Sequence, residues 1–312
     1  MRGMTGTPYR LLLAALILPL GGGAQAFEGG TSAYLKGFRD FMSGYLPQEP
    51  GLSLREDIYV YGGRNERTLL SGRLQLQLDT QVIANIVRPT FVTPWTILGA
   101  NYGVALSWAQ PNIALEGQLQ TPLGTVGNAG ERFGIGDVAL SPIVLGWHAG
   151  SWHMNAAFAV YLPVGDYDVA RTINAGNNYW AVSPQVGVTY FDPQTGWDLS
   201  VATVYVTSWE NPATRYESGD ALHVDFAVGK QVSSNLKLGI VGYGLWQVSD
   251  DAGAGARLGP NRARVYGLGP ALTYSFKVAD TPVSILGKYY REFGERNTFV
   301  GNSGTISVSV RF

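Results

Sequence analysis

The chain has 312 residues, a formal net charge of −1 and no cysteine. This composition provides neither a basic surface for nucleic acid nor a disulfide framework, so a core or a closed hydrogen-bonded sheet must hold the fold. The 41 glycines and 12% aromatic residues are typical of many strands, tight turns and aromatic girdles. Because no segment beyond the N-terminal region is long and apolar enough for a membrane-spanning helix, the composition favours an all-β protein.

The first 26 residues have the organisation of a secretory signal. Arg2 and Arg10 provide a basic region, an apolar run follows from Leu11 to Leu20, and Ala24-Gln25-Ala26 has the small-x-small pattern of a cleavage site. The apolar run is too short to cross a bilayer as a helix. We therefore predict a signal peptide over residues 1–26, cleaved near Ala26, and export of the rest of the chain.

Residues 27–51 differ from the rest of the chain because their apolar residues recur at helical spacing. This spacing predicts a short amphipathic helix between about residues 33 and 45. Such a segment would plug the interior of a β-structure or lie at its periplasmic mouth, and a loosely ordered tail is the alternative. The apolar residues concerned are Tyr34, Leu35, Phe38, Phe41, Met42 and Tyr45.

From residue 52 onward the pattern changes to alternation, which is clearest between residues 73 and 86. Leu76 and Leu78 share the face that we expect to contact lipid. Gln77 and Asp79 share the face that we expect to line an interior. The stretch is longer than the about 5–6 residues usual in globular strands, whereas barrel strands need about 9–11 residues to cross a membrane. A soluble sandwich would show the same alternation, so the connections between the strands must distinguish the two folds.

Short and long connections alternate along the predicted strands, and this rhythm favours a membrane barrel with short periplasmic turns and long external loops. A sandwich has no reason to place every long loop at the same end of its hairpins. The pattern predicts an all-β, antiparallel, up-and-down transmembrane barrel of about twelve strands over residues 52–312. The short connections are 149–151, 192–196, 233–235 and 279–282, and the long ones are 120–134, 163–178, 209–219, 249–263 and 293–302.

The C-terminal residues 305–312 alternate without interruption and end on an aromatic residue, like the closing strand of a bacterial outer-membrane barrel. We predict that Ile306 and Val308 face lipid and that Ser307 faces the interior. The strand is expected to pair antiparallel with residues 52–61, because pairing removes both exposed edges. Phe312 is then the predicted signal for the barrel-assembly machinery.

Polar and aromatic residues on the predicted inner faces are the candidate lumen-lining residues. Charges there would be costly in a dry core unless paired, so they fit a wetted interior. His223 and Asp225 are two apart on one face, and they would bind a metal or a ligand or, as we favour, join a polar network. An Asp250-Asp251 calcium site is the alternative to a solvated loop, and we predict no metal or cofactor. The candidates are Arg73, Gln77, Asp79, Asp137, His153, His223, Asp225, Tyr243, Lys288 and Tyr290.

Residues 134–256 also resemble a known family. The carrying stretches are Gly136-Asp137, Leu162 to Tyr167, Asn177 to Trp180, Asn211 to Thr214 and Asp250 to Gly255. As a set they resemble the outer-membrane proteins associated with the meta-pathway of phenol degradation, close to SphA-like proteins. The resemblance implies a bacterial outer-membrane β-barrel that transports hydrophobic or aromatic compounds, and it implies no catalytic residues.

The sequence therefore predicts a passive outer-membrane channel for small hydrophobic or aromatic compounds. Tyr243 and Tyr290 are expected either to stack on aromatic solutes or simply to fill space. A structural or ligand-binding barrel without conductance is the alternative, and a lipid-modifying enzyme is less favoured. No G-x-S-x-G or H-E-x-x-H motif is present, and His153 and His223 are predicted to face away from lipid. The expected partners are outer-membrane lipid, lipopolysaccharide, the assembly machinery and the solute, with no nucleic acid.

Overall fold

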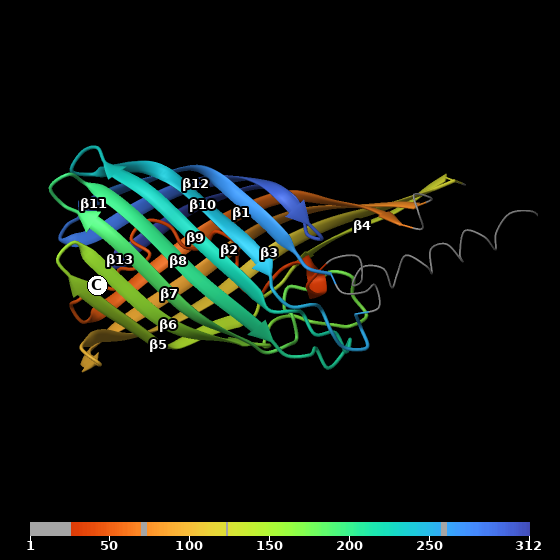
Figure 1. The fold of residues 1–312 in the computed structure, drawn as a ribbon, viewed down its shortest axis with the longest axis horizontal. Helices are drawn as coiled ribbons and strands as arrows, with labels where there is room; N and C mark the ends of the chain where they lie inside the picture. Colours follow the sequence, from red (N-terminus) through yellow and green to blue (C-terminus); the bar gives the residue numbers. More distant parts are fainter. Residues whose placement is uncertain (1–25, 70–73, 123, 257–260) are drawn as a thin grey trace, which may run out of the picture.

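The computed structural model describes residues 26–69, 74–122, 124–256 and 261–312. Most of the described chain after residue 50 forms long antiparallel strands that wrap into one barrel (Figure 1). No helix within these residues is long and apolar enough to cross a membrane. The strands are β1 (Gly51–Leu69), β2 (Leu74–Ile97), β3 (Ala100–Thr121), β4 (Gly124–Phe133), β5 (Val138–Ala149), β6 (Trp152–Leu162), β7 (Ala181–Asp192), β8 (Trp197–Ser208), β9 (Ala221–Gln231), β10 (Leu236–Gln247), β11 (Arg264–Val278), β12 (Thr281–Arg296) and β13 (Val300–Arg311).

The barrel closes between its first and last strands. β1 pairs antiparallel with β13, from Ser53 opposite Arg311 to Arg64 opposite Val300. The other neighbours in the sheet are consecutive in sequence, except that β3 pairs with β5 as well as with β4. Because closure pairs the backbone groups of both end strands, the predicted antiparallel barrel and its closing strand are confirmed.

The predicted long loop over residues 120–134 is wrong, because most of this stretch is strand β4. β4 pairs with residues 112–121 of β3, whereas β5 pairs with residues 101–108 of the same strand. Between β4 and β5, the N–H groups of Gly134 and Gly136 donate to the carbonyls of Pro111 and Ala109 in β3. β4 and β5 therefore follow one line along β3. Of the thirteen described strands, all but β4 form the barrel wall, which gives the predicted twelve.

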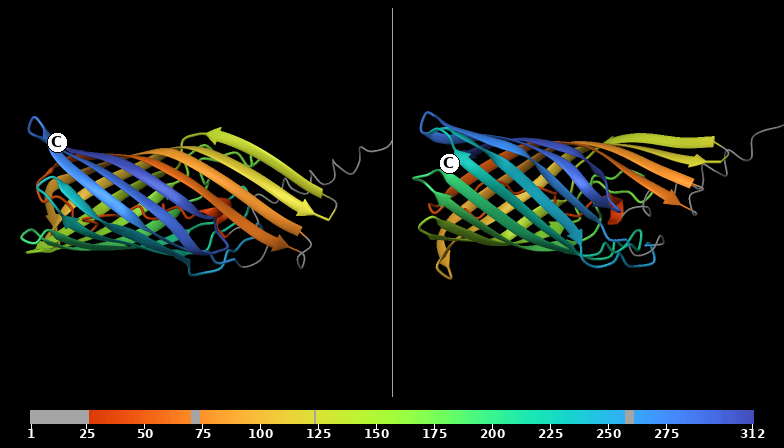
Figure 2. Two further views of the ribbon diagram at one scale, coloured as in Figure 1. Left: turned by 90° about the horizontal axis from the view of Figure 1, so that it is seen from above. Right: turned by 45° about the horizontal axis from the view of Figure 1, so that its top comes forward.

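Strands β1 to β4 extend past the other strands at one end of the barrel (Figure 2). We call this extension the outer flap and the end that carries it the outer end; the C-terminus lies at the opposite, inner end. The outer flap comprises residues 65–69, 74–83, 112–121 and 124–133 of β1 to β4.

The predicted long connection over residues 293–302 is also wrong, because β12 and β13 are separated by residues 297–299 alone.

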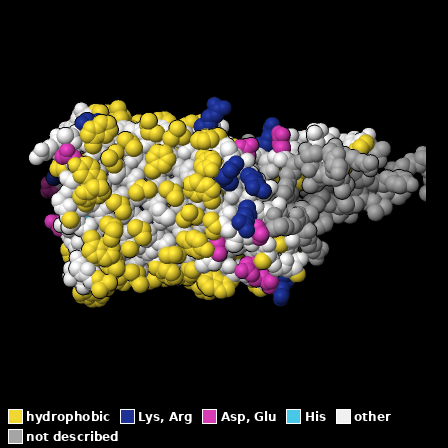
Figure 3. Space-filling view, viewed as in Figure 1, with side chains coloured by type: hydrophobic (Ala, Val, Ile, Leu, Met, Phe, Trp, Pro, Cys, Tyr) yellow, Lys and Arg dark blue, Asp and Glu magenta, His cyan; other side chains and the backbone are white. Residues whose placement is uncertain are grey.

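Side chains of the wall alternate between its outer surface and the interior. In β8, Leu199 and Val201 are 46% and 42% exposed, whereas Ala202 and Val204 are 3% and 1% exposed. Exposed apolar side chains cover the wall on the face shown in Figure 3, and charged side chains gather beyond them toward the outer end. An apolar belt with a charged margin is the surface that a barrel presents to a bilayer.

Residues 26–50, which lead into β1, lie inside the barrel (Figure 1). The predicted helix between residues 33 and 45 is wrong, because this stretch contains bends and turns, and the described N-terminal residues hold only a short 3₁₀ turn, Glu28–Gly30. Backbone groups that a helix would pair internally are bound by the wall instead. The N–H of Gly44, for example, donates to Thr189 at 2.9 Å. The wall thus satisfies a non-helical backbone.

Candidate functional site

The interior of the barrel contains residues 26–50, which we call the lumen segment. At the outer end, the Glu28 carboxylate accepts hydrogen bonds from Thr214 at 2.7 Å and from Asn211 at 2.9 Å. At the inner end, the Gln48 carbonyl accepts a hydrogen bond from Asn101 at 2.9 Å. The lumen segment therefore passes from one end of the interior to the other, and the wall contacts that hold it define the candidate site.

A buried cluster of charges holds the middle of the lumen segment. Asp40 Oδ2 lies 2.8 Å from Arg55 Nη2 and 3.0 Å from Lys288 Nζ. Asp57 accepts from the Nε atoms of Arg55 at 2.9 Å and Arg88 at 2.7 Å. Two carboxylates thus face three cations, and only Asp40 comes from the lumen segment. Because a buried charge is costly without its partner, we infer that Asp40 is an electrostatic attachment of the segment. We call the five residues the ion cluster.

The predicted pair His223 and Asp225 binds the lumen segment near its start. The Tyr34 hydroxyl donates to Asp225 Oδ2 at 2.6 Å, and the Arg39 N–H donates to the same oxygen at 3.0 Å. His223 lies with its ring edge-on to Tyr34 and its Nε2 3.1 Å from the Ser32 hydroxyl. These residues form a polar network with the segment. Among the described residues, no group of three His, Cys, Asp or Glu side chains is placed to hold a metal ion.

Glu292 is a second carboxylate that holds the segment. Lys36 Nζ lies 2.5 Å from its Oε1, and the hydroxyl of Tyr243 donates to the same oxygen. The Tyr61 hydroxyl donates to Oε2 at 2.8 Å, and so does the Gly301 N–H at 2.7 Å. Both oxygens therefore have at least two partners, as a buried carboxylate requires.

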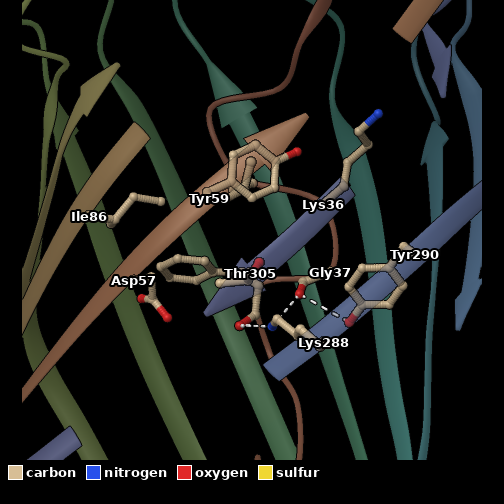
Figure 4. Close-up of a pocket in the computed structure, with 10 residues that line it drawn as sticks. Lys36, Gly37, Asp57, Tyr59, Ile86, Lys288, Tyr290 and Thr305 are labelled. Atoms are coloured by element: carbon tan, nitrogen blue, oxygen red, sulfur yellow. Dashed lines mark hydrogen bonds between the residues drawn. The ribbon is translucent and has the colours of Figure 1, made fainter. Parts of the chain in front are cut away.

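The close-up in Figure 4 shows Gly37 of the segment hydrogen-bonded to Lys288 and Tyr290 of the wall. The Gly37 carbonyl accepts from Lys288 Nζ at 2.8 Å and from the Tyr290 hydroxyl at 3.2 Å. A Cβ at this position would come within 2.7 Å of Tyr243, and the backbone φ is +66°; both favour glycine. The cavity between the segment and the wall, which Tyr59 also lines, measures only about 10 Å³. Such a space holds at most about one water molecule.

His153 faces the interior near the inner end. Its Nδ1 lies 2.8 Å from Nδ1 of His148, on the neighbouring strand. The ring of Tyr45 from the lumen segment packs against both histidines with centroid distances of 5.2 Å. The inner end of the segment is therefore held by aromatic contacts, whereas its middle is held by charges.

The prediction that Gln77 and Asp79 line the interior is wrong. Leu76 and Leu78 are only 5% and 9% exposed and belong to the inner apolar cluster, so strand alternation places Gln77 and Asp79 outside. There Asp79 pairs with Arg64 at 2.7 Å. The physical reason is that this part of β2 belongs to the outer flap, whose outer face lies beyond the apolar belt and carries polar side chains.

Two further candidates do not lie among these contacts. Arg73 falls outside the described residues. Asp137 follows β4, and its carboxylate accepts from the N–H groups of Gly165 at 3.0 Å and Asn177 at 2.7 Å. Burial raises the pKa of Asp137 above its ordinary value, although these hydrogen bonds oppose the change. Asp137 therefore anchors the β6–β7 connection, and its oxygens are not directed at the lumen segment.

Sequence reasoning missed much of the ion cluster and Glu292. The signal was present in β1, where Arg55 and Asp57 lie on one strand face and the exposed Leu54, Glu56 and Ile58 lie on the other. Glu292 shares the strand face of Lys288 and Tyr290, which were both predicted, so the same parity identifies it. Residues within the lumen segment follow no strand alternation, and sequence periodicity therefore gave no information on their partners.

Comparisons with known proteins agree with this architecture. The family model described as "Putative MetA-pathway of phenol degradation" matches residues 65–308. The structure is similar to the COG4313 outer membrane channel from Pseudomonas putida F1, with a TM-score of 0.62 and 16% identity over 86% of this chain and 97% of that one. At this identity, the likeness supports the fold. No curated protein matches the chain by sequence.

Two other solved structures are similar at lower scores. One is the transport unit of the autotransporter AIDA-I from Escherichia coli, with a TM-score of 0.46 and 10% identity over 91% of this chain and 94% of that one. The other is a Pseudomonas aeruginosa FadL homologue, with a TM-score of 0.41 and 8% identity over 95% and 97%. Both fall below the similarity on which a functional argument can rest.

Proposed function

The chain belongs to the family described as "Putative MetA-pathway of phenol degradation", and from this premise we propose that it is an outer-membrane channel for passive uptake of small hydrophobic or aromatic compounds. The observation that carries the proposal is that the wall encloses the whole lumen segment. The interior of the barrel is therefore wide enough for a solute path once the segment is displaced. The similarity to a protein described as an outer membrane channel supports it.

The contacts that hold the lumen segment are of a kind that lets it leave the interior without unfolding the wall. Among the described residues, no strand of the wall pairs with the segment. Side-chain hydrogen bonds, ion pairs and apolar packing hold it, with one backbone hydrogen bond from the Ala26 N–H to the Asn297 carbonyl. The wall ladder therefore stays intact when the segment moves. A displaced segment would expose a path that mixes aromatic rings with hydroxyl and charged groups, including Tyr243 and Tyr290 at a centroid distance of 4.9 Å. Such a lining suits a ring that carries a polar group.

A barrel that binds a ligand or serves a structural role without conducting is the second candidate. The tight filling at Gly37, where the cavity is about 10 Å³, favours it. The two functions differ in one requirement, because only a channel needs the lumen segment to leave its position.

Uptake by cells tests the proposal. Cells that express the full chain should accumulate a radiolabelled alkylphenol faster than cells that lack it, and the difference should saturate at high solute concentration. Cells that express an unrelated outer-membrane barrel at the same level provide the control. Equal uptake in all three, with the barrel folded in the outer membrane, would favour the non-conducting alternative.

A further inference from the structure

The outer flap carries an apolar groove on its inner face that the lumen contacts do not explain. The groove measures about 620 Å³, within the size range of small-molecule sites. It lies between the flap and the β6–β7 connection, which contributes Ile173. The apolar side chains that line it are Leu76, Leu78, Leu115, Leu119, Val126 and Ile173.

The polarity of the flap is reversed relative to that of the barrel wall. On its outer face Asp79 pairs with Arg64, and Gln118 donates to Glu116 at 2.9 Å. Its inner face carries the leucines. Leu76, Leu78 and Leu119 are largely buried, and the groove opens between them and the β6–β7 connection. A groove lined in this way accepts the apolar body of a small molecule.

Two arginines add a charge preference to the groove. Glu131 also lines it, but this residue lies opposite Ala114 on the outer face of the flap and accepts a hydrogen bond from Asn112 there. Arg132 lies opposite Ile113 on the inner face of the flap, and its Nε is buried without a hydrogen-bond partner. Arg171, on the β6–β7 connection, also lines the groove, and its Nε lies 3.4 Å from Asp168. A buried guanidinium donor that lacks an acceptor favours an anion, and a planar carboxylate matches guanidinium geometry best.

We propose that this groove binds a small amphiphilic carboxylate, with its apolar body against the leucines of the flap and its carboxylate on Arg132. The groove lies at the outer end of the barrel, so it would concentrate such a molecule at the entrance of the proposed channel. That biological meaning rests on the proposed function, whereas the binding itself does not.

Calorimetry on the full-length protein in lipid nanodiscs tests the proposal, with empty nanodiscs correcting for partitioning into lipid. The probes are 4-butylbenzoate and its uncharged analogue 4-butylbenzyl alcohol. We expect the carboxylate to bind at least about tenfold more tightly than the alcohol, since a hydrogen bond to a charged group contributes about this factor in affinity. Arg132→Gln should abolish the preference and leave alcohol binding unchanged. Val126→Asn should weaken both probes.

Arg64→Gln is the matched control, because Arg64 lies on the outer surface near the same strands. It should leave both affinities unchanged, and heat-modifiable gel migration should show that each variant is folded. The absence of saturable binding, or a preference that survives Arg132→Gln, would overturn the groove proposal. Binding without any cellular uptake would instead refute the channel and leave the groove intact.

Discussion

Substitution of Asp40 by asparagine should release the lumen segment from the barrel wall. Asp40 is 6% exposed and contacts Arg55 and Lys288, whose side chains are 23% and 3% exposed. The substitution conserves volume but leaves three cations with the single carboxylate of Asp57. Removal of one partner from a buried ion pair costs about 3–5 kcal/mol. The cations regain water when the segment leaves, so the free-energy cost of the substitution falls on the state with the segment docked. The equilibrium constant for docking should therefore fall by at least about 100-fold.

Hydrogen exchange of the protein in nanodiscs measures this change. Amide protons of residues 34–45 should exchange much faster in Asp40→Asn than in the wild type, while those of the wall strands should remain protected. Asp79→Asn is the control, because Asp79 forms a comparable pair with Arg64 on the outer surface. Wild-type exchange in Asp40→Asn would refute the idea that the ion cluster holds the segment.

Three further predictions follow from the same structure. Gly37→Ala should displace the segment and raise exchange around it, because the new Cβ would lie within 2.7 Å of Tyr243 at a φ of +66°; unchanged exchange would contradict the tight fit. Burial raises the pKa of Glu28, so the docked segment holds this proton more tightly and docking should strengthen as pH falls through the raised pKa. A spin label attached at Thr31→Cys should therefore lose mobility as the pH falls. Glu28→Gln should remove this dependence of label mobility on pH. Deletion of Phe312, whose side chain is 69% exposed, should reduce the heat-modifiable folded fraction in cells without lowering the thermal stability of the barrel that does assemble.

Period-2 alternation predicted the strands well, because each wall strand separates an exposed face from a buried one. In β13, Ile306 is 63% exposed and Ser307 is 1% exposed, as predicted. Alternation alone does not state which face is inside. In β2 the assignment failed at Leu76 and Leu78, since the flap reverses the membrane rule; the outward Ile83, 56% exposed, was the exception that signalled the reversal.

Tertiary contacts decided the parts that the sequence pattern missed. β4 is rich in glycine, which usually marks turns, yet it is a strand because β3 provides a continuous partner. The lumen segment has helical spacing, but wall side chains such as Thr189 and Lys288 bind its backbone. In both places a long-range partner replaced the local hydrogen bonds that propensity anticipates.

The most direct test of the account is the single-channel current of the wild-type protein and of Asp40→Asn in the same planar bilayer. We propose that the barrel is a conduit filled by a segment that the ion cluster retains. We therefore expect brief, rare openings for the wild type and frequent, long openings for Asp40→Asn, with Asp79→Asn like the wild type. Silence from both proteins, or identical currents from both, would contradict it.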